Sequence, residues 1–152
     1  MVGYMLTWTT YGTWLQGDKR GYIKDGQILS ENEALYNANR KLQKSMTVTL
    51  PRGCRQIVKE AILKEAKEIG QRIYAMAICS NHVHIVAGCV NQEIGKVAGR
   101  YKKSATNALR QNGFTENVWT KGFDKRFCFD EKELNQRINY VQRHNEITLE
   151  GL

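Results

Sequence analysis

Two of the three histidines in the chain, His82 and His84, are separated by a single residue. They open the run HVHIVAG, whose alternation and β-branched residues predict a strand over residues 82–88. Because successive side chains of a strand point to opposite faces of its sheet, both imidazoles project from the same face. Two imidazoles so placed can bind one metal ion, although the spacing also fits two polar residues on a solvated sheet face.

The third histidine, His144, follows Tyr140 by four residues in a segment with helical periodicity. Residues four apart lie one above the other on a helix, so the phenol and the imidazole share a face. This face lies beside the apolar stripe of the helix, which is formed by Leu134, Ile138 and Val141. If the stripe packs on the open face of the sheet, His144 completes a three-nitrogen site with the other two histidines, and Tyr140 points at a bound substrate. Taken alone, a tyrosine and a histidine at this spacing are more often exposed on the helix surface.

The composition indicates one globular domain spanning residues 1–152, with 41% hydrophobic and 25% charged residues. The 23 Lys and Arg residues against 15 Asp and Glu give a net charge of +8, which favours a polyanionic partner such as nucleic acid. No apolar run approaches the ~20 residues of a membrane-spanning helix, and neither a secretory signal nor a lipidation motif is recognised. We therefore expect a cytoplasmic protein with no membrane partner.

The four cysteines are spaced widely, at Cys54, Cys79, Cys89 and Cys128. No two of them form the CxxC or CxxxxC pair that is typical of a zinc ribbon or a redox dithiol. We therefore interpret all four as buried thiols without a metal.

The clearest periodicity in the sequence predicts a helix over residues 92–110, apolar on one side. The candidates for DNA binding collect on its opposite side: Lys96, Arg100, Lys103 and Arg110. If each cation neutralises one phosphate of a single strand, affinity should fall with salt with a logarithmic slope of about −3. The same pattern is also typical of a solvated helix face. Three aromatic residues could stack on unpaired bases: Trp8, Tyr11 and Trp14. Trp8 lies in a predicted strand, so packing in the core explains it at least as well.

The remaining patterns define the elements that must position these residues. Strands are predicted over residues 2–10, 72–79, 82–88 and 125–129, and helices over residues 56–70, over 92–110 and from Asp130 onward. Residues 11–55 contain several glycines and mixed charges, and we interpret them as an irregular insertion with a short helix near residues 33–42. The β-α-β-β-α-β order predicts an α+β fold, a ferredoxin-like antiparallel sheet with helices packed on it. A C-terminal helix that carries Tyr140 is added to this fold.

These motifs resemble those of the single-tyrosine HUH transposases. The histidine pair, preceded by Ser80 and Asn81, is similar to the HUH motif of that family. Tyr140, four residues before His144, is similar to the nucleophile on its last helix.

Two further stretches resemble in particular the REP-associated tyrosine transposases, a domesticated branch of the family. They are the run LTWTTYGTWL at residues 6–15 and the segment from Trp119 to Phe123 and Asp124. The resemblance covers most of the chain and is loose over residues 17–55.

The resemblance implies a metal-dependent endonuclease and strand transferase acting on single-stranded DNA that contains a hairpin, as a monomer or a homodimer. Tyr140 would attack a phosphodiester and leave a 5′-phosphotyrosine and a free 3′-hydroxyl, so that rejoining needs no ATP. His82 and His84 would bind a divalent metal ion, Mg²⁺ or Mn²⁺. Where this chain has His144, the family usually carries Asn or Gln, followed by Pro in the REP-associated branch. Three imidazoles suit Zn²⁺, Mn²⁺ or Ni²⁺ better than Mg²⁺.

Two functions of other classes are also compatible with the sequence. A catalytically silent DNA-binding module would keep the basic helix and show no cleavage. A hydrolytic metal-dependent phosphodiesterase would use the same three histidines with water as its nucleophile. Replacing Tyr140 by Phe separates all three, since only strand transfer through tyrosine requires the phenol oxygen.

Overall fold

The computed structural model describes residues 1–13 and 47–150, with side chains described as far as residue 144. Within these ranges the elements follow the order β1 (Gly3–Thr9), α3 (Arg52–Ile69), β2 (Ile73–Ile78), β3 (His82–Gly88), α4 (Ile94–Gln111), β4 (Asp124–Cys128) and α5 (Glu131–Glu150). This is the predicted β-α-β-β-α-β order with one helix added. None of the helices in the described ranges combines the length and the apolar character that a bilayer crossing requires.

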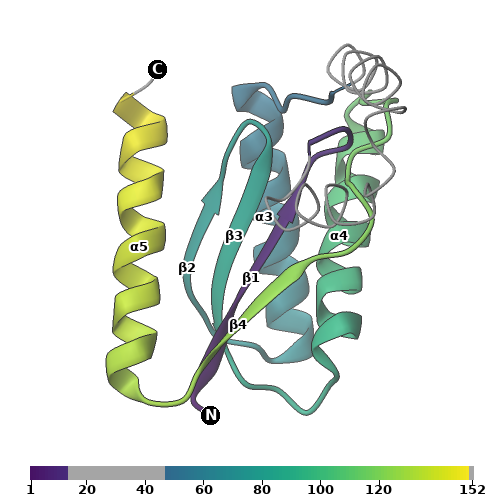
Figure 1. The fold of residues 1–152 in the computed structure, drawn as a ribbon. Helices are drawn as coiled ribbons and strands as arrows, with labels where there is room; N and C mark the ends of the chain where they lie inside the picture. Colours follow the sequence, from purple (N-terminus) through teal and green to yellow (C-terminus); the bar gives the residue numbers. More distant parts are fainter. Residues whose placement is uncertain (14–46, 151–152) are drawn as a thin grey trace, which may run out of the picture.

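The strands form one antiparallel sheet in the order β2-β3-β1-β4, which confirms the predicted ferredoxin-like α+β fold. Figure 1 shows α3 and α4 side by side across the sheet, while α5 stands apart from them and runs along β2 and β3. The sheet is therefore covered on both faces, by two helices on one side and by one on the other.

Alternation along the strands sorts the apolar residues into two cores. We call the larger one the α3/α4 core; its main fully or almost fully buried members are Tyr4, Leu6, Trp8, Val58, Ile62, Val83, Ile85, Val97, Tyr101 and Leu109. We call the smaller one the α5 core; its buried members are Met5, Ala77, Cys79, Val86, Cys128, Leu134 and Val141. The two lists take alternate residues of β1 and β3, as the side-chain period of a strand requires.

The first helix begins earlier than the sequence pattern predicts. Its first turn, from Arg52, carries no large apolar residue, so hydrophobic periodicity becomes visible only at Ile57. Pro51 precedes the helix in an extended conformation, and Gly70 ends it with φ of 72°, a left-handed conformation that glycine adopts without strain.

The predicted insertion over residues 11–55 is therefore wrong at its C-terminal end. Val48 and Leu50 are buried, and their backbone N–H groups donate to the carbonyls of Tyr11 and Ser80 at 2.8 and 2.7 Å. These residues belong to the folded body, and α3 starts two residues after Leu50. The short helix predicted near residues 33–42 lies outside the described residues.

The last helix begins where the sequence predicts. The backbone N–H of Glu133 donates to Asp130 Oδ1 at 2.8 Å, which makes Asp130 the N-cap. The predicted stripe packs on the sheet, with Leu134 and Val141 buried and Ile138 partly buried in the α5 core. This packing determines which side of α5 faces the sheet, including β3.

Candidate metal and nucleophile site

The site is built at the tip of the hairpin that joins β2 and β3. The backbone N–H of Cys79 donates to the carbonyl of His82 at 2.8 Å, which closes the two-residue turn. Beyond the turn, Val83 and Ile85 are fully buried in the α3/α4 core. The alternation of β3 therefore directs His82 and His84 to the other face, under α5, as predicted.

The three histidines meet on that face. The Nε2 atoms of His82 and His144 are 2.6 Å apart, and the ring centroids of His84 and His144 are 5.0 Å apart. The rings of His82 and His84 are themselves 4.7 Å apart. Tyr140 joins the group from α5, with its ring centroid 5.7 Å from that of His84. The structure thus brings together all four residues on which the sequence prediction of a site depends.

Polar neighbours orient the two strand histidines. His82 Nδ1 lies 2.7 Å from Asn81 Oδ1, and because an amide oxygen only accepts, this nitrogen is the donor. The lone pair of neutral His82 is then on Nε2, which faces His144. His84 Nδ1 forms a hydrogen bond with Thr7 Oγ1 at 2.8 Å, between residues that are paired across β1 and β3. Such outer contacts fix the ring orientation of a metal-binding histidine.

Both strand histidines are neutral at pH 7. Burial, aided by the electrostatic influence of the neighbouring His144, lowers the pKa of His82 from 6.5 to about 4. Burial, together with the other two imidazoles, lowers the pKa of His84 to about 3. Metal ions bind the neutral form of imidazole, so protons compete with a cation here less than at an ordinary histidine.

A donor set for a cation is present among the described side chains. One ligand atom from each of Cys79, His82 and His144 lies within 4.8 Å of the other two, and His84 is the next ring. This group can hold a metal ion. Its nitrogen and sulfur donors fit a borderline or soft cation better than Mg²⁺, which prefers oxygen ligands.

Cys79 was not predicted as part of the site, since the sequence suggested a buried thiol without a metal. The available signal was the spacing Cys79-x-x-His82 across a predicted two-residue turn. In a hairpin with such a turn, the residues on either side of it are cross-strand neighbours.

The predicted DNA-binding residues lie on the other side of the molecule. Lys96, Arg100, Lys103 and Arg110 are all exposed on α4. Arg100 forms a 2.7 Å ion pair with Glu65 of α3, and this bond lowers the pKa of the Glu65 carboxyl. Arg110 donates to the backbone carbonyls of Phe114 and Glu116 at 2.8 and 2.6 Å. Two of the four cations thus have local partners.

Of the three aromatic candidates for base stacking, Trp8 is fully buried in the α3/α4 core. It packs edge-on against Trp119 with ring centroids 6.0 Å apart. Tyr11 is exposed, and Trp14 lies outside the described residues. The core explanation of Trp8 is therefore the right one.

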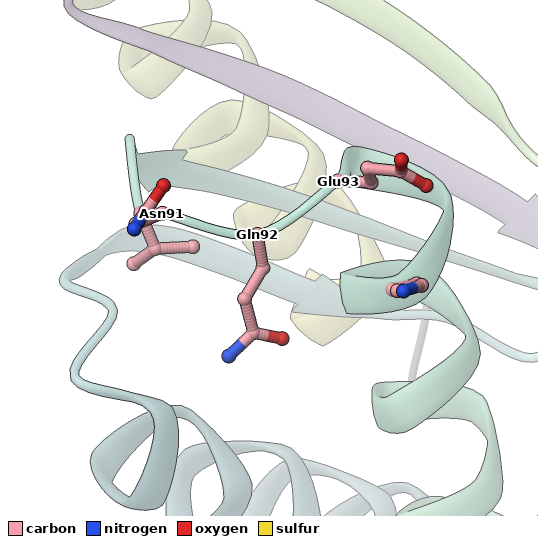
Figure 2. A pocket seen from close by; sticks show the side chains of 5 residues that line it. Asn91, Gln92 and Glu93 are labelled. Carbon is pink, nitrogen blue, oxygen red and sulfur yellow. The ribbon is translucent and has the colours of Figure 1, made fainter.

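A surface pocket lies at the far end of β3 from the histidines. Figure 2 shows Asn91, Gln92 and Glu93 projecting from the loop that joins β3 to α4, and Val90 and Lys96 complete the lining. His82 begins β3 and this loop follows its last residue, Gly88, so the pocket is not part of the histidine site.

Two further cations lie close to the tyrosine in sequence and were not predicted. Arg137 and Arg143 stand three residues before and three residues after Tyr140 on α5. Side chains three apart are neighbours on a helix surface. The i ± 3 spacing around the tyrosine could have identified them.

Comparison of the sequence with family models identifies the family of the chain. The model of the family described as "Transposase IS200 like" matches residues 42–144, which is more than half of the chain. The chain belongs to this family. Among curated proteins, no significant match is found.

Two solved structures have a similar fold. One is a REP-associated tyrosine transposase bound to a REP hairpin, with a TM-score of 0.56 and 14% identity over 94% of this chain and 66% of that one. The chain thus spans just under two thirds of that protein. The other is a protein from Deinococcus radiodurans R1 described as a transposase, with a TM-score of 0.53 and 15% identity over 93% of this chain and 89% of that one. At these identities the likeness concerns the fold alone.

Proposed function

We propose that the chain is a metal-dependent single-stranded DNA endonuclease and strand transferase with Tyr140 as its nucleophile. The observation that carries the proposal is the convergence of Tyr140 on α5 with three histidines, two of them from β3. A phenol is a weak nucleophile at neutral pH, so an attacking tyrosine needs a centre that makes the phosphate more electrophilic. Membership of the IS200-like family supports the same reaction class.

The reaction exchanges one phosphoester for another. Tyr140 Oη attacks the phosphorus of a phosphodiester, the bond to the 3′ oxygen breaks, and a 5′-phosphotyrosine and a 3′-hydroxyl are left. The phenol loses one proton and the 3′ oxygen gains one, so the step consumes neither protons nor ATP. Tyr140 is 42% exposed, which leaves it open to a strand approaching from solvent.

His82, His84 and His144 are the proposed ligands of the divalent cation. When bound, the cation supplies charge neutralisation and polarises a non-bridging phosphate oxygen. Asn81 and Thr7 hold the two strand rings in orientation. The imidazole donors favour Mn²⁺, Zn²⁺ or Ni²⁺ over Mg²⁺.

The substrate we propose is a single strand that contains a hairpin. The similar fold of a transposase bound to a REP hairpin supports this choice. Arg137 and Arg143 would contact phosphates next to the scissile one. The exposed α4 cations Lys96, Arg100, Lys103 and Arg110 would contact more distant parts of the same DNA, around the edge of the sheet.

The test uses a library of 3′-labelled single-stranded hairpin oligonucleotides with Mn²⁺. Covalent protein–DNA species are separated on a denaturing gel, and their trapped 5′ ends are mapped. We expect an adduct with the natural chain and none with Tyr140→Phe, which should bind the DNA within about twofold because it loses a single hydroxyl. An adduct that persists in Tyr140→Phe would assign the nucleophile elsewhere.

The same assay separates the alternatives. If the DNA is cleaved without forming an adduct, and Tyr140→Phe cleaves it as well, the chain is a water-using phosphodiesterase. Binding without cleavage in Mg²⁺, Mn²⁺, Zn²⁺ or Ni²⁺ would indicate a silent DNA-binding module.

A further inference from the structure

The strand register places the side chain of Cys79 beside that of His82. In the β2–β3 ladder Ile78 is paired with Val83 and Ala77 with His84, so the next pair toward the turn is Cys79 with His82. The backbone hydrogen bond from Cys79 N–H to His82 O, at 2.8 Å, continues this ladder. Side chains directly opposite in an antiparallel pair share a face, with Cβ atoms about 4.5–5.5 Å apart. The thiol therefore points to the α5 face, where the histidines are.

Burial agrees with this placement. Cys79 is 4% exposed and belongs to the α5 core with Ala77 and Val141. Its sulfur and one nitrogen each of His82 and His144 lie within 4.8 Å of one another. In a tetrahedral site with bonds of about 2.0–2.3 Å, ligand atoms are about 3.3–3.7 Å apart. The Nε2 atoms of His82 and His144, which are 2.6 Å apart, must therefore separate slightly, and no ligand atom of the group is more than 4.8 Å from another.

We propose that Cys79 is a metal ligand of this centre and that Cys79, His82 and His144 together select Zn²⁺ over Mg²⁺. The metal site belongs to the proposed function, but the inference does not depend on the DNA chemistry. On binding, the S–H bond breaks, a sulfur–metal bond forms and the proton passes to solvent. A thiolate is a soft ligand that hard cations avoid, and it donates charge to the metal. We therefore expect zinc to bind more tightly than Mn²⁺ and to support less strand cleavage.

The first test is the ligand sphere of the natural chain loaded with one equivalent of Zn²⁺. X-ray absorption should show one sulfur at about 2.3 Å together with nitrogen at about 2.0–2.1 Å. A shell of nitrogen and oxygen alone would overturn the proposal. Because this measurement needs no variant, it does not depend on how a substitution affects folding.

The second test compares two buried cysteines of the α5 core. With Co²⁺ as a probe, the natural chain should show a thiolate-to-cobalt charge-transfer band in the near ultraviolet. Cys79→Ser should lose the band and bind Zn²⁺ more than about tenfold more weakly. Mutating a residue that only hydrogen-bonds to a ligand already lowers metal affinity by about that factor. Cys128→Ser, a matched change at a fully buried position, should keep the charge-transfer band and the zinc affinity of the natural chain. Circular dichroism and thermal melting verify that each variant is folded.

The outcomes separate this proposal from the proposed function. Equal zinc affinity in Cys79→Ser and the natural chain would overturn the role of Cys79, while a covalent DNA adduct formed in Mn²⁺ would still support the nucleophile. A sulfur ligand without any adduct would leave Cys79 as a ligand and overturn the strand transfer.

Discussion

The two faces of the sheet are made from alternate residues of the same strands and differ in what they bury. On the face covered by α3 and α4, Val83 and Ile85 are fully buried in the large apolar core. On the face covered by α5, the neighbouring positions are His82 and His84, beside a smaller core. Burying a polar ring costs free energy unless it is hydrogen-bonded. The division indicates that one face supplies most of the stability. The other face can then carry imidazoles, whose hydrogen bonds to Asn81 and Thr7 offset part of the cost of burying them.

Burial shifts the pKa values of titratable groups on both faces. On the α5 face, burial lowers the pKa values of two histidines to about 4 and about 3. On the α3/α4 face, the polar groups include two phenols: Tyr101 donates to Gln71 Oε1, and Gln71 Nε2 donates to Tyr4 Oη at 2.7 Å. Burial raises the pKa of both Tyr4 and Tyr101. The two histidines and the two tyrosines are therefore all held in their neutral forms at pH 7.

The largest effect is expected from a change on the α5 face. His82→Ala should lower metal-dependent strand cleavage by about 1000-fold, because stabilising the charge at the transferring phosphate is usually the largest single contribution to such catalysis. The thermal midpoint measured in a chelator should change little or rise. Cleavage rates are compared by denaturing gel at matched DNA occupancy. Unchanged cleavage would refute the metal role of this histidine.

The next largest effect separates stability from chemistry along one strand. Ile85→Ala should cost about 2–5 kcal/mol of unfolding free energy, since it leaves a cavity in the α3/α4 core. The thermal midpoint should fall by about 4–20 °C, since 1 kcal/mol shifts it by about 2–4 °C in a chain of this length. His84→Ala, one position earlier on the other face, should cost far less stability and weaken the binding of the divalent cation. Equal losses of stability in the two variants, measured by urea unfolding, would show that both faces stabilise the fold to the same extent.

A smaller effect concerns pH. The folded pKa values of His82 and His84 lie below the unfolded value of 6.5, so between about pH 6.5 and 4 the unfolded chain binds more protons than the folded one. The stability of the metal-free chain should therefore decrease as the pH falls through this window. Above pH 10 the buried tyrosines act in the opposite sense, because their raised pKa values make the folded chain the better proton binder and stability falls as the pH rises.

Thermal melts in a chelator from pH 7 to 4.5 measure the acid effect. The double variant His82→Ala/His84→Ala should give a flatter curve over that range. A curve as steep as that of the natural chain would assign the acid sensitivity to other groups.

The smallest effect tests whether DNA reaches the α3/α4 side. Lys96→Ala/Lys103→Ala should reduce the salt slope of hairpin binding by about 1.4, or 0.7 for each phosphate that is no longer neutralised. Arg100→Ala should change the slope less, because its guanidinium is paired with Glu65. Binding is measured by fluorescence anisotropy at salt concentrations from about 50 to 200 mM, the range over which such slopes are large. An unchanged slope in the lysine double variant would confine the DNA to the α5 side.

Most of the fold could be predicted because its signals are local. The alternation of β3, the stripe of α4 and the Asp130 cap each lie within one segment, and each is found within about two residues of its predicted place. The start of α3 was missed because its first turn is polar. The burial of Leu50 was missed because its partners, among them Ser80, are distant in sequence.

The site was predicted only in part for the same reason. Spacing placed His82 with His84, and Tyr140 with His144, but only the packing of α5 on β3 brings the two pairs together. Cys79 was overlooked because its side chain is a neighbour of His82 only once the strand register is known. The local partners of Arg100 and Arg110 likewise come from other elements or loops.

The site is assembled from two elements that pack together through the small α5 core. His82 and His84 come from the sheet, whereas Tyr140 and His144 come from a helix that joins the body after Asp130. A local opening that lifts α5 would leave the sheet, α3 and α4 paired as before and would separate the nucleophile from the strand histidines. Proteins open in such cooperative units at a free energy below that of global unfolding. Amide exchange in α5 would thus report the fraction of time for which the folded chain has no assembled site.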